Sequence, residues 1–169
     1  MQDAEQGGRL KTREDFAVTG AAGGTHAAKR YVVLFVCLGN ACRSPMAEAI
    51  ARSDAWDVIE PTSAGIVPLG FVVQETIETL SEGGYLAEGL KSKALNKVLW
   101  DAADVVINMT GQPADVAFRR FSDLDKVEEW RVRDPYGEDR AVYQKICGEI
   151  QERVAELAER LRAAARIGE

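Results

Sequence analysis

The feature that most constrains the fold is an apolar run at residues 31–36 that leads directly into a short loop at residues 37–44 and then a helix-like sequence. The run is rich in β-branched residues and has the length of a buried strand. Gly39 permits unusual backbone dihedral angles in the loop, and Pro45 suits the first turn of a helix. In such a strand–loop–helix unit, backbone N–H groups and the positive end of the helix converge on one point. The sequence therefore predicts an anion-binding loop after the first strand.

Strand-like and helix-like segments alternate along the rest of the chain. Strands separated by helices favour right-handed crossovers and a parallel sheet covered on both faces. We therefore expect a single α/β domain, with ligands beyond the carboxyl ends of the strands. The predicted strands are residues 31–36, 57–60, 104–109 and 126–130, and the predicted helices are residues 44–53, 72–81, 94–100, 113–120 and about 141–161.

The composition is that of an ordinary globular protein. The 169 residues are 46% hydrophobic and 28% charged, which is enough for one domain with its own core. The formal net charge of −6 argues against a nucleic-acid-binding surface. The three cysteines lack the spacing of a disulfide framework or a zinc site and fit a reducing compartment. We expect a cytoplasmic monomer that binds no membrane, metal or cofactor, because no apolar signal-like or membrane-spanning run is visible.

The first 30 residues differ from the rest of the chain. They mix charged residues with a Gly/Ala-rich stretch and show no sustained hydrophobic period. We expect a flexible N-terminal extension at residues 1–30, followed by the folded domain at residues 31–169. His26, the single histidine, lies in this extension and is expected to be solvated.

Two reactive side chains bracket the predicted loop. Cys37 opens it and Arg43 follows six positions later. A cysteine in an electropositive loop is biased toward thiolate, and the planar guanidinium of Arg43 can bind two oxygens of a phosphate-like group. The alternative is a buried structural cysteine, because free cysteine is among the most buried residue types. The position of Cys37 at the end of the strand, instead of inside it, favours a nucleophile with a phosphate clamp.

Residues 33–48, VLFVCLGNACRSPMAE, resemble the active-site signature of the low-molecular-weight protein tyrosine phosphatases. Three further segments fit that family in order: Ser63-Ala64-Gly65, residues 104–110 and Asp134-Pro135-Tyr136-Gly137. The resemblance extends from about residue 31 to residue 161. It implies a four-stranded parallel sheet with helices on both faces and a phosphate-binding loop after the first strand.

The resemblance also implies a reaction, the metal-independent hydrolysis of a phosphate monoester through a cysteinyl-phosphate intermediate. Cys37 would be the nucleophile, and Arg43 with the loop amides would hold the phosphate oxygens. Asp134 would be the general acid and base, although an Asp-Pro turn on its own is more often structural. The expected phosphate-binding residues are Leu38, Gly39, Asn40, Ala41, Cys42 and Arg43.

Supporting roles follow from the same resemblance. Asn40 and Ser63 are similar to family residues that hydrogen-bond to each other and hold the shape of the loop. Ser44 would donate its hydroxyl proton to the thiolate, with helix capping as the alternative. Cys42 stands where the family has a cysteine that forms a reversible disulfide with the nucleophile under peroxide. Cys147, on the apolar face of the last helix, is expected to be buried and inert.

The expected substrate is phosphotyrosine in a protein, or a small aryl phosphate. Tyr136 is expected at the mouth of the pocket, where it would stack on an aromatic leaving group; an exposed turn tyrosine is the alternative. Family phosphatases often place an aromatic residue in the loop after Ser63-Ala64-Gly65, where this chain has Leu69 and then Phe71. Phe71 or Tyr136 would substitute for that residue, or the pocket is more permissive.

Arsenate reductases share this fold and supply an alternative function. Residues 63–66 resemble the reductase branch as much as the phosphatases. Thioredoxin-linked reductases need two further cysteines after the third strand, where this chain has Thr110 and Ala117, so their disulfide relay cannot run. A reductase that uses an external thiol, glutathione or mycothiol, remains open. A third hypothesis is a phosphate-binding domain without turnover, against which the intact nucleophile, clamp and acid argue.

Overall fold

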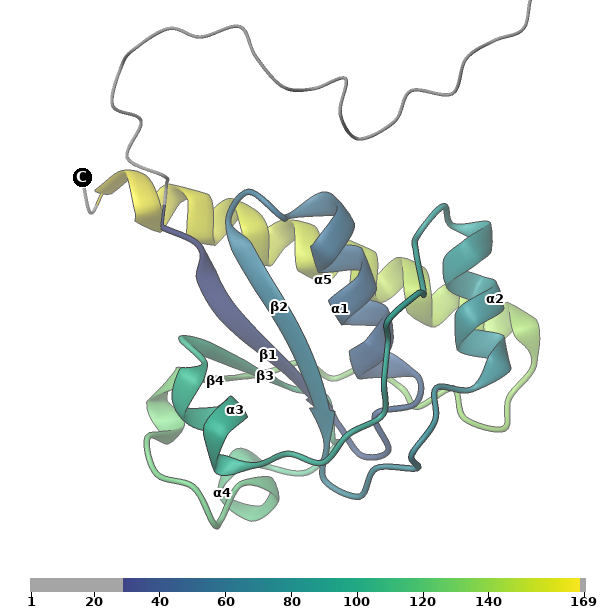
Figure 1. Cartoon of the computed structure of the whole chain (residues 1–169), viewed down its shortest axis with the longest axis horizontal. Helices are drawn as coiled ribbons and strands as arrows, with labels where there is room; N and C mark the ends of the chain where they lie inside the picture. The colour runs from purple at the N-terminus through teal and green to yellow at the C-terminus, as the bar shows by residue number, and fades with distance from the viewer. Residues whose placement is uncertain (1–28, 168–169) are drawn as a thin grey trace, which may run out of the picture.

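The structure, a computed structural model, describes residues 29–167 of the chain. Four parallel strands form one sheet, as the family resemblance implies, and their order is β2-β1-β3-β4 (Figure 1). The predicted N-terminal extension, apart from its last two residues, and His26 lie outside the described residues. The strands are β1 (Tyr31–Cys37), β2 (Ile59–Gly65), β3 (Val105–Asn108) and β4 (Val127–Glu129).

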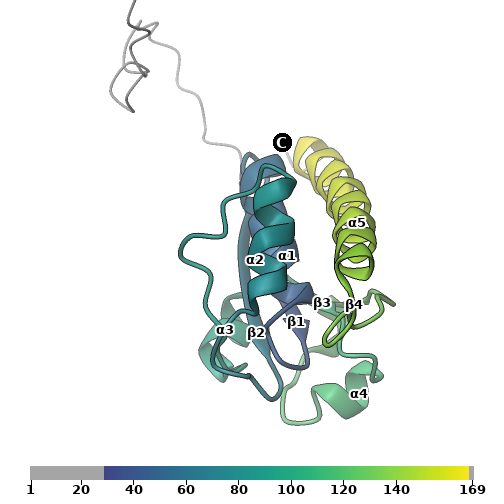
Figure 2. The same ribbon diagram turned by 90° about the vertical axis from the view of Figure 1, so that its right-hand side faces the viewer.

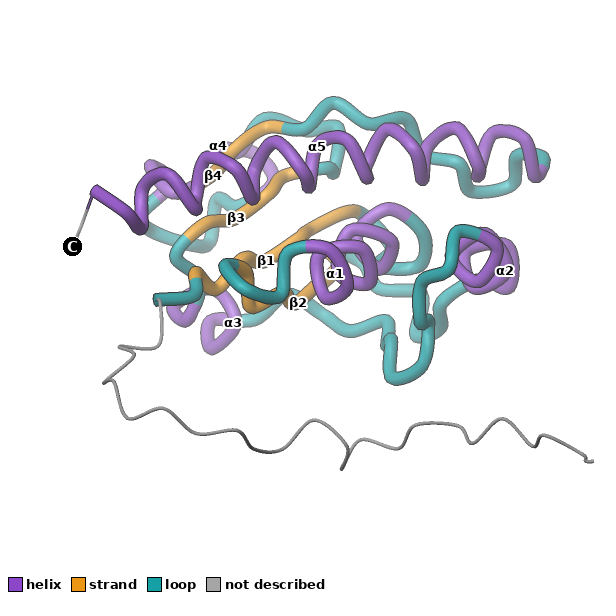
Figure 3. Tube along the Cα trace, turned by 90° about the horizontal axis from the view of Figure 1, so that it is seen from above, coloured by secondary structure: helices purple, strands orange, loops and turns teal. Residues whose placement is uncertain are grey.

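Helices cover both faces of the sheet. α1 and α5 pack in one core cluster with β1, whereas α3 and α4 contribute to a second cluster around Trp100 and Phe118. Figure 2 shows α3 and α5 on opposite sides of the strands, and Figure 3 shows α5 running along one side of the sheet. The helices are α1 (Arg43–Asp54), α2 (Gln74–Glu82), α3 (Lys97–Ala102), α4 (Ala114–Ala117) and α5 (Arg140–Ile167), and a 3₁₀ turn lies at Leu124–Lys126.

β1 is the central strand that places the loop. Val33, Phe35 and Cys37 lie in the core cluster with α1 and α5, whereas Leu34 and Val36 lie in the other cluster. This alternation explains why the whole run is apolar, because a strand buried on both faces has no polar side. Cys37 therefore ends β1 on the face that α1 covers.

β2 differs from its predicted position. The sequence places a strand at residues 57–60 that ends before Pro61, but the strand starts at Ile59 and continues through Pro61 to Gly65. β2 is an edge strand, where a proline is tolerated because no neighbouring strand needs its missing N–H. The extension carries Ser63 and Gly65 to the carboxyl end of the sheet, beside the loop that follows β1.

The helix bounds also differ in detail. α3 starts three residues later than predicted, because the side chain of Asn96 caps it by accepting from Leu99 N at 2.9 Å. α4 ends at Ala117, and Phe118 turns into the core against Trp100. α5 continues past its apolar stripe to Ile167 through alanines, which favour helix without needing a partner. In the part of the chain that the structure describes, no helix combines the length and the apolar character needed to cross a bilayer.

Candidate active site

The loop between β1 and α1 is held by its carbonyl groups. Residues 38–42 connect Cys37, the last residue of β1, to Arg43, the first of α1. Their carbonyls accept hydrogen bonds from the segment that follows β2, which braces the loop from outside. The bonds run from Val67 N to Leu38 O at 2.9 Å, from Leu69 N to Gly39 O at 2.9 Å and from Val73 N to Ala41 O at 3.2 Å.

The backbone N–H groups of the same loop are left available. Within the described residues, those of residues 38–42 donate to no backbone or side-chain acceptor. Buried backbone donors are normally paired, so a run of unpaired N–H groups on one short loop is suited to an anion with several oxygens. The sequence predicted an anion-binding loop. The structure adds how the loop is built, with its carbonyls hydrogen-bonded to the segment after β2 and its N–H groups left available.

Ser44 lies against the sulfur of Cys37. The distance between Cys37 Sγ and Ser44 Oγ is 3.0 Å. Asn40 Nδ2 donates to Ser44 Oγ at 2.7 Å, so the hydroxyl hydrogen of Ser44 is free to donate elsewhere. Ser44 Oγ has two possible acceptors for this hydrogen, and Cys37 Sγ at 3.0 Å is closer than Ala64 O at 3.5 Å. The helix begins at an N-cap, Cys42, without a side-chain cap bond, which favours thiolate stabilisation over capping for Ser44.

Asn40 holds the loop in an uncommon conformation. Its φ of 46° is left-handed, a region that asparagine tolerates better than most residues. Asn40 Nδ2 also donates to Ser63 Oγ at 3.0 Å, which is the contact that the family resemblance implied. Lys93 N donates to Asn40 Oδ1 at 2.9 Å and fixes the other end of the amide. The amide therefore ties the phosphate loop to β2 and to the segment before α3.

Glu48 is the last member of a series of hydrogen bonds that runs from Ser44 through Asn40 and Ser63. The sequence analysis did not identify Glu48 as a functional residue. Ser63 Oγ donates to Glu48 Oε2 at 2.5 Å, and Arg52 donates to Glu48 Oε1 at 2.5 Å. Lys93 adds a second positive charge at 4.0 Å. Glu48 lies four residues after Ser44 on α1 and so faces the same side of the helix, a spacing that could have identified it.

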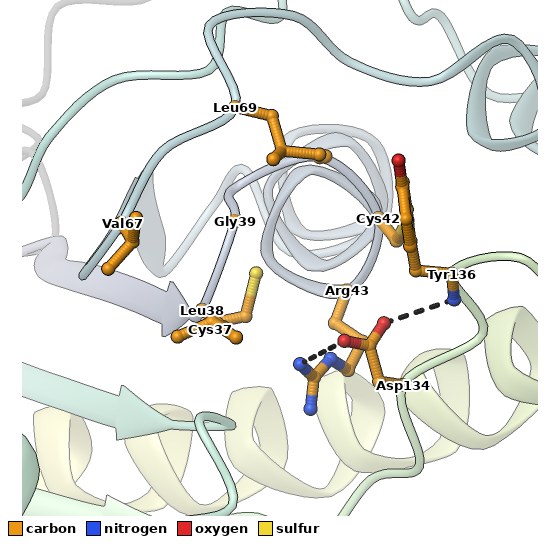
Figure 4. Close-up of a pocket in the computed structure, with 10 residues that line it drawn as sticks. Cys37, Leu38, Gly39, Cys42, Arg43, Val67, Leu69, Asp134 and Tyr136 are labelled. Carbon is orange, nitrogen blue, oxygen red and sulfur yellow. Dashed lines mark hydrogen bonds and ion pairs between the residues drawn. The ribbon is translucent and has the colours of Figure 1, made fainter.

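Arg43 is fixed by two backbone carbonyls from the segments that follow β3 and β4. Its guanidinium is buried, and Nη1 donates to Met109 O at 2.6 Å and Val132 O at 3.2 Å. Nη2 donates to Asp134 Oδ2 at 3.0 Å (Figure 4). Nε is the one buried side-chain polar atom of the described residues that has no hydrogen-bond partner. A buried guanidinium nitrogen needs an acceptor, so this atom points to an anionic oxygen as its partner.

Asp134 lies on the segment between β4 and α5. Tyr136 N donates to Asp134 Oδ1 at 3.1 Å, so one carboxylate oxygen holds the turn and the other faces Arg43. Figure 4 shows Asp134 and Tyr136 on the opposite side of the hollow from Leu38 and Val67. The predicted turn is real, and it brings the carboxyl group to the same hollow as the cysteine.

One pocket of about 340 Å³ joins the predicted residues. Its lining includes Cys37, Arg43 and Asp134, together with Tyr136, which the sequence placed at the mouth. Further lining residues are Leu38, Gly39, Ala41, Cys42, Val67 and Leu69. Asn40, Ser44 and Ser63 are fully buried behind the loop and support it instead of lining the pocket.

The prediction that Phe71 forms part of the pocket wall is wrong. Phe71 is 57% exposed and does not line the pocket. Gly70, with φ of 86°, separates Leu69, which lines the pocket, from Phe71, which does not. Leu69 and Val67 form the wall instead, and Val67 was not predicted from the sequence.

The other two cysteines are protected. Burial raises the pKa of Cys42, whose Sγ lies 3.6 Å from the hydroxyl of Tyr143, and burial also raises the pKa of Cys147. Both thiols are therefore neutral at neutral pH, and Cys147 is buried on α5 as expected. A disulfide between Cys42 and Cys37 remains a prediction.

Comparison with known proteins places this arrangement in a family. The family model for low molecular weight phosphotyrosine protein phosphatases matches residues 32–166. A protein-arginine-phosphatase from Bacillus subtilis is 32% identical over 145 residues, which cover 77% of this chain and 96% of that protein. Arsenate reductase 1 from Bacillus cereus is 32% identical over 130 residues, which cover 75% of this chain and 93% of that protein.

Solved structures agree with these matches. An arginine phosphatase from Geobacillus stearothermophilus superposes with a TM-score of 0.73 at 31% identity, over 79% of this chain and 94% of that one. A low molecular weight protein tyrosine phosphatase from T. tengcongensis superposes with a TM-score of 0.70 at 32% identity, over 77% of this chain and 99% of that one. The chain belongs to the low molecular weight phosphotyrosine protein phosphatase family.

Proposed function

We propose that the protein is a phosphoric monoester hydrolase that removes the phosphoryl group from phosphotyrosine in proteins, and from small aryl phosphates, through a cysteinyl-phosphate intermediate. The observation that carries the proposal is one pocket lined by Cys37, Arg43 and Asp134, beside a loop whose N–H groups are available and an arginine whose buried Nε has no partner.

In the first step, Cys37 attacks phosphorus in line with the ester oxygen. The S–P bond forms as the P–O bond breaks, and the bonding electron pair leaves with the ester oxygen. The loop N–H groups and Arg43 hold the three other oxygens, where preorganised donors lower the barrier without reorganising. Asp134 gives its proton to the leaving oxygen. The donation from Ser44 stabilises the sulfur as thiolate before the attack.

In the second step, water hydrolyses the phosphocysteine. The carboxylate of Asp134 takes a proton from the water, whose oxygen forms the new bond to phosphorus. The S–P bond breaks, the thiolate of Cys37 returns, and inorganic phosphate leaves. The position of Asp134 on the rim, with one oxygen held by the turn, suits a group that acts first as acid and then as base.

The walls of the pocket favour an aromatic leaving group. Leu38, Val67 and Leu69 present apolar surface around the phosphate loop, and Tyr136 offers an aromatic ring on the other side. Such walls bury the ring of a phosphotyrosine, while its phosphate reaches the loop. Phosphoarginine is the second candidate, because proteins similar to this chain at 31–32% identity are arginine phosphatases.

One experiment compares the three candidate reactions. Purified protein is given, with a chelator present, a phosphotyrosine peptide, a phosphoarginine peptide of the same sequence, or arsenate with glutathione. We expect the highest kcat/KM for the phosphotyrosine peptide, its loss in Cys37→Ser, and its retention in Cys147→Ala as the matched control. Faster release of phosphate from the phosphoarginine peptide would show that phosphoarginine, and not phosphotyrosine, is the substrate. Arsenate-dependent consumption of glutathione without hydrolysis of either peptide would show that the protein is an arsenate reductase and not a phosphatase.

A further inference from the structure

A second hollow lies at the same end of the sheet as the phosphate loop. Its volume is about 460 Å³, larger than the catalytic pocket. Figure 1 shows α4 at the end of the sheet to which β1 and β2 point, and this hollow is formed where α4 meets the segments after β2 and β3. The residues that matter for its chemistry are Ile66, Gln112, Val116, Arg119, Arg120 and Phe121.

The lining of this hollow carries uncompensated positive charge. Arg119 and Arg120 are both exposed, and within the described residues neither forms an ion pair. No carboxylate lines the hollow. In a chain with a net charge of −6, two unpaired arginines on one wall are a local exception to the overall charge.

Two other hollows among the described residues are electrically balanced. The catalytic pocket contains Arg43 with Asp134. A hollow at the start of α5 has two basic and two acidic residues in its lining, namely Arg133, Lys145, Asp139 and Glu149. The lining of the hollow beside α4 is therefore more positive than the linings of these two hollows.

The hollow shares a wall with the catalytic pocket. Ile66 lines the hollow and Val67, the next residue, lines the pocket. Ile66 N donates to Cys37 O at 3.2 Å and Val67 N to Leu38 O at 2.9 Å, so this wall is fixed to the phosphate loop. A substrate chain whose phosphorylated residue enters the pocket and whose flank passes over this wall therefore enters the hollow that Arg119 and Arg120 line.

We propose that the hollow beside α4 is a docking site for an acidic segment that flanks the phosphorylated residue of a protein substrate. The inference rests on the proposed function and adds a sequence preference to it. The guanidinium groups of Arg119 and Arg120 bind the carboxylates of the segment, as planar forks do. Val116, which is 52% exposed, and Phe121 receive the aliphatic parts of the same side chains.

The test uses phosphotyrosine and phosphoarginine peptides whose flanks carry either three Glu or three Gln, placed before or after the phosphorylated residue. We expect one Glu-flanked arrangement to have a higher kcat/KM than its Gln counterpart. The double variant R119A/R120A lowers that kcat/KM about fivefold, as expected for two exposed ion pairs, and leaves aryl phosphate turnover unchanged. About 0.5 M salt removes the difference. The matched control K145A/R166A, two exposed residues on α5, leaves all values unchanged.

Binding separates this inference from the proposed function. Fluorescence anisotropy with the Cys37→Ser protein measures peptide affinity without turnover. If no peptide is hydrolysed but Glu flanks bind more tightly through Arg119 and Arg120, docking stands and the hydrolase proposal falls. If peptides are hydrolysed and bound equally well with Glu and Gln flanks, or R119A/R120A behaves as wild type, docking is overturned. Sedimentation showing a dimer that R119A/R120A dissociates would assign the hollow to a second copy and also overturn it.

Discussion

Arg43 and Asp134 form an ion pair across the pocket, with Arg43 Nη2 donating to Asp134 Oδ2 at 3.0 Å. The guanidinium side chain is 5% exposed and the carboxylate 44% exposed. Two backbone carbonyls fix the guanidinium, whereas the carboxylate is held by a turn on the rim. The buried cation is therefore the fixed member of the pair, and the carboxylate is the member that can exchange its partner for substrate and water.

Replacing Asp134 tests its role as proton donor. Asp134→Asn keeps an acceptor for Arg43 but has no proton to give as an acid, so kcat/KM for a phosphotyrosine peptide, which reports the steps up to phosphocysteine formation, falls by about 10²- to 10⁴-fold. The loss is smaller for p-nitrophenyl phosphate, because that leaving group needs little protonation. Steady-state kinetics on both substrates check this. An equal loss on both would contradict general-acid catalysis by Asp134.

Ser44 is expected to stabilise the thiolate of Cys37. Ser44→Ala removes a hydrogen bond to a charged group, worth about 1.5–3 kcal/mol, and slows alkylation of Cys37 by iodoacetamide about 10- to 100-fold. The control is Ser53→Ala, an exposed serine on the same helix, which leaves the rate unchanged. Mass spectrometry of the alkylated peptide gives the rate. Identical alkylation rates for the two variants would show that Ser44 does not stabilise the thiolate of Cys37.

Gly65 allows the end of β2 to approach the phosphate loop. A Cβ at Gly65 would lie 2.9 Å from both Asn40 N and Leu38 O, which are backbone atoms and cannot simply turn aside. Gly65→Ala therefore displaces the loop and lowers kcat/KM at least about tenfold, since small misplacements at an active site are expensive. Gly148→Ala on α5 meets no atom within 4 Å and keeps full activity. Wild-type kinetics for Gly65→Ala would show that the loop is less rigid than these contacts indicate.

The sequence predicted the parts of the molecule that depend on local patterns. The strand before Cys37, the parallel sheet and the meeting of Cys37, Arg43 and Asp134 follow from hydrophobic runs and from motifs that resemble the family. The edge position of β2 was not visible, so Pro61 was read as a strand end. The turn at Gly70 was not visible either, and it removes Phe71 from the pocket. Glu48 was missed because it acts through Ser63, a residue distant in sequence.

The Asp57–Arg162 pair makes stability depend on pH. Hydrogen bonds from Arg162 hold the pKa of Asp57 below its usual value in the folded protein. A lowered folded-state pKa means that the carboxylate stabilises the fold above its unfolded pKa and that this contribution is lost as pH falls through the folded pKa. Because the pair is at the surface, Arg162→Ala costs about 0.5 kcal/mol at neutral pH and nothing once Asp57 is protonated.

Urea unfolding at neutral pH and at a pH below the folded pKa of Asp57 measures this difference. Arg166→Ala on the last turn of α5 is the control, because it removes a charge of the same sign without an ion pair among the described residues. A loss of stability in Arg162→Ala that is the same at both pH values would assign the effect to packing instead of the ion pair.

The covalent intermediate on Cys37 is the central claim, and rapid-quench mass spectrometry tests it most directly. Asp134→Asn protein is mixed with p-nitrophenyl phosphate, whose leaving group departs without an acid, while the missing base slows hydrolysis of the intermediate. After acid quenching, the account predicts one added phosphoryl group per chain, located by peptide mapping on Cys37 and missing in Cys37→Ala. A phosphoryl group on another residue, or turnover that survives Cys37→Ala, would contradict it.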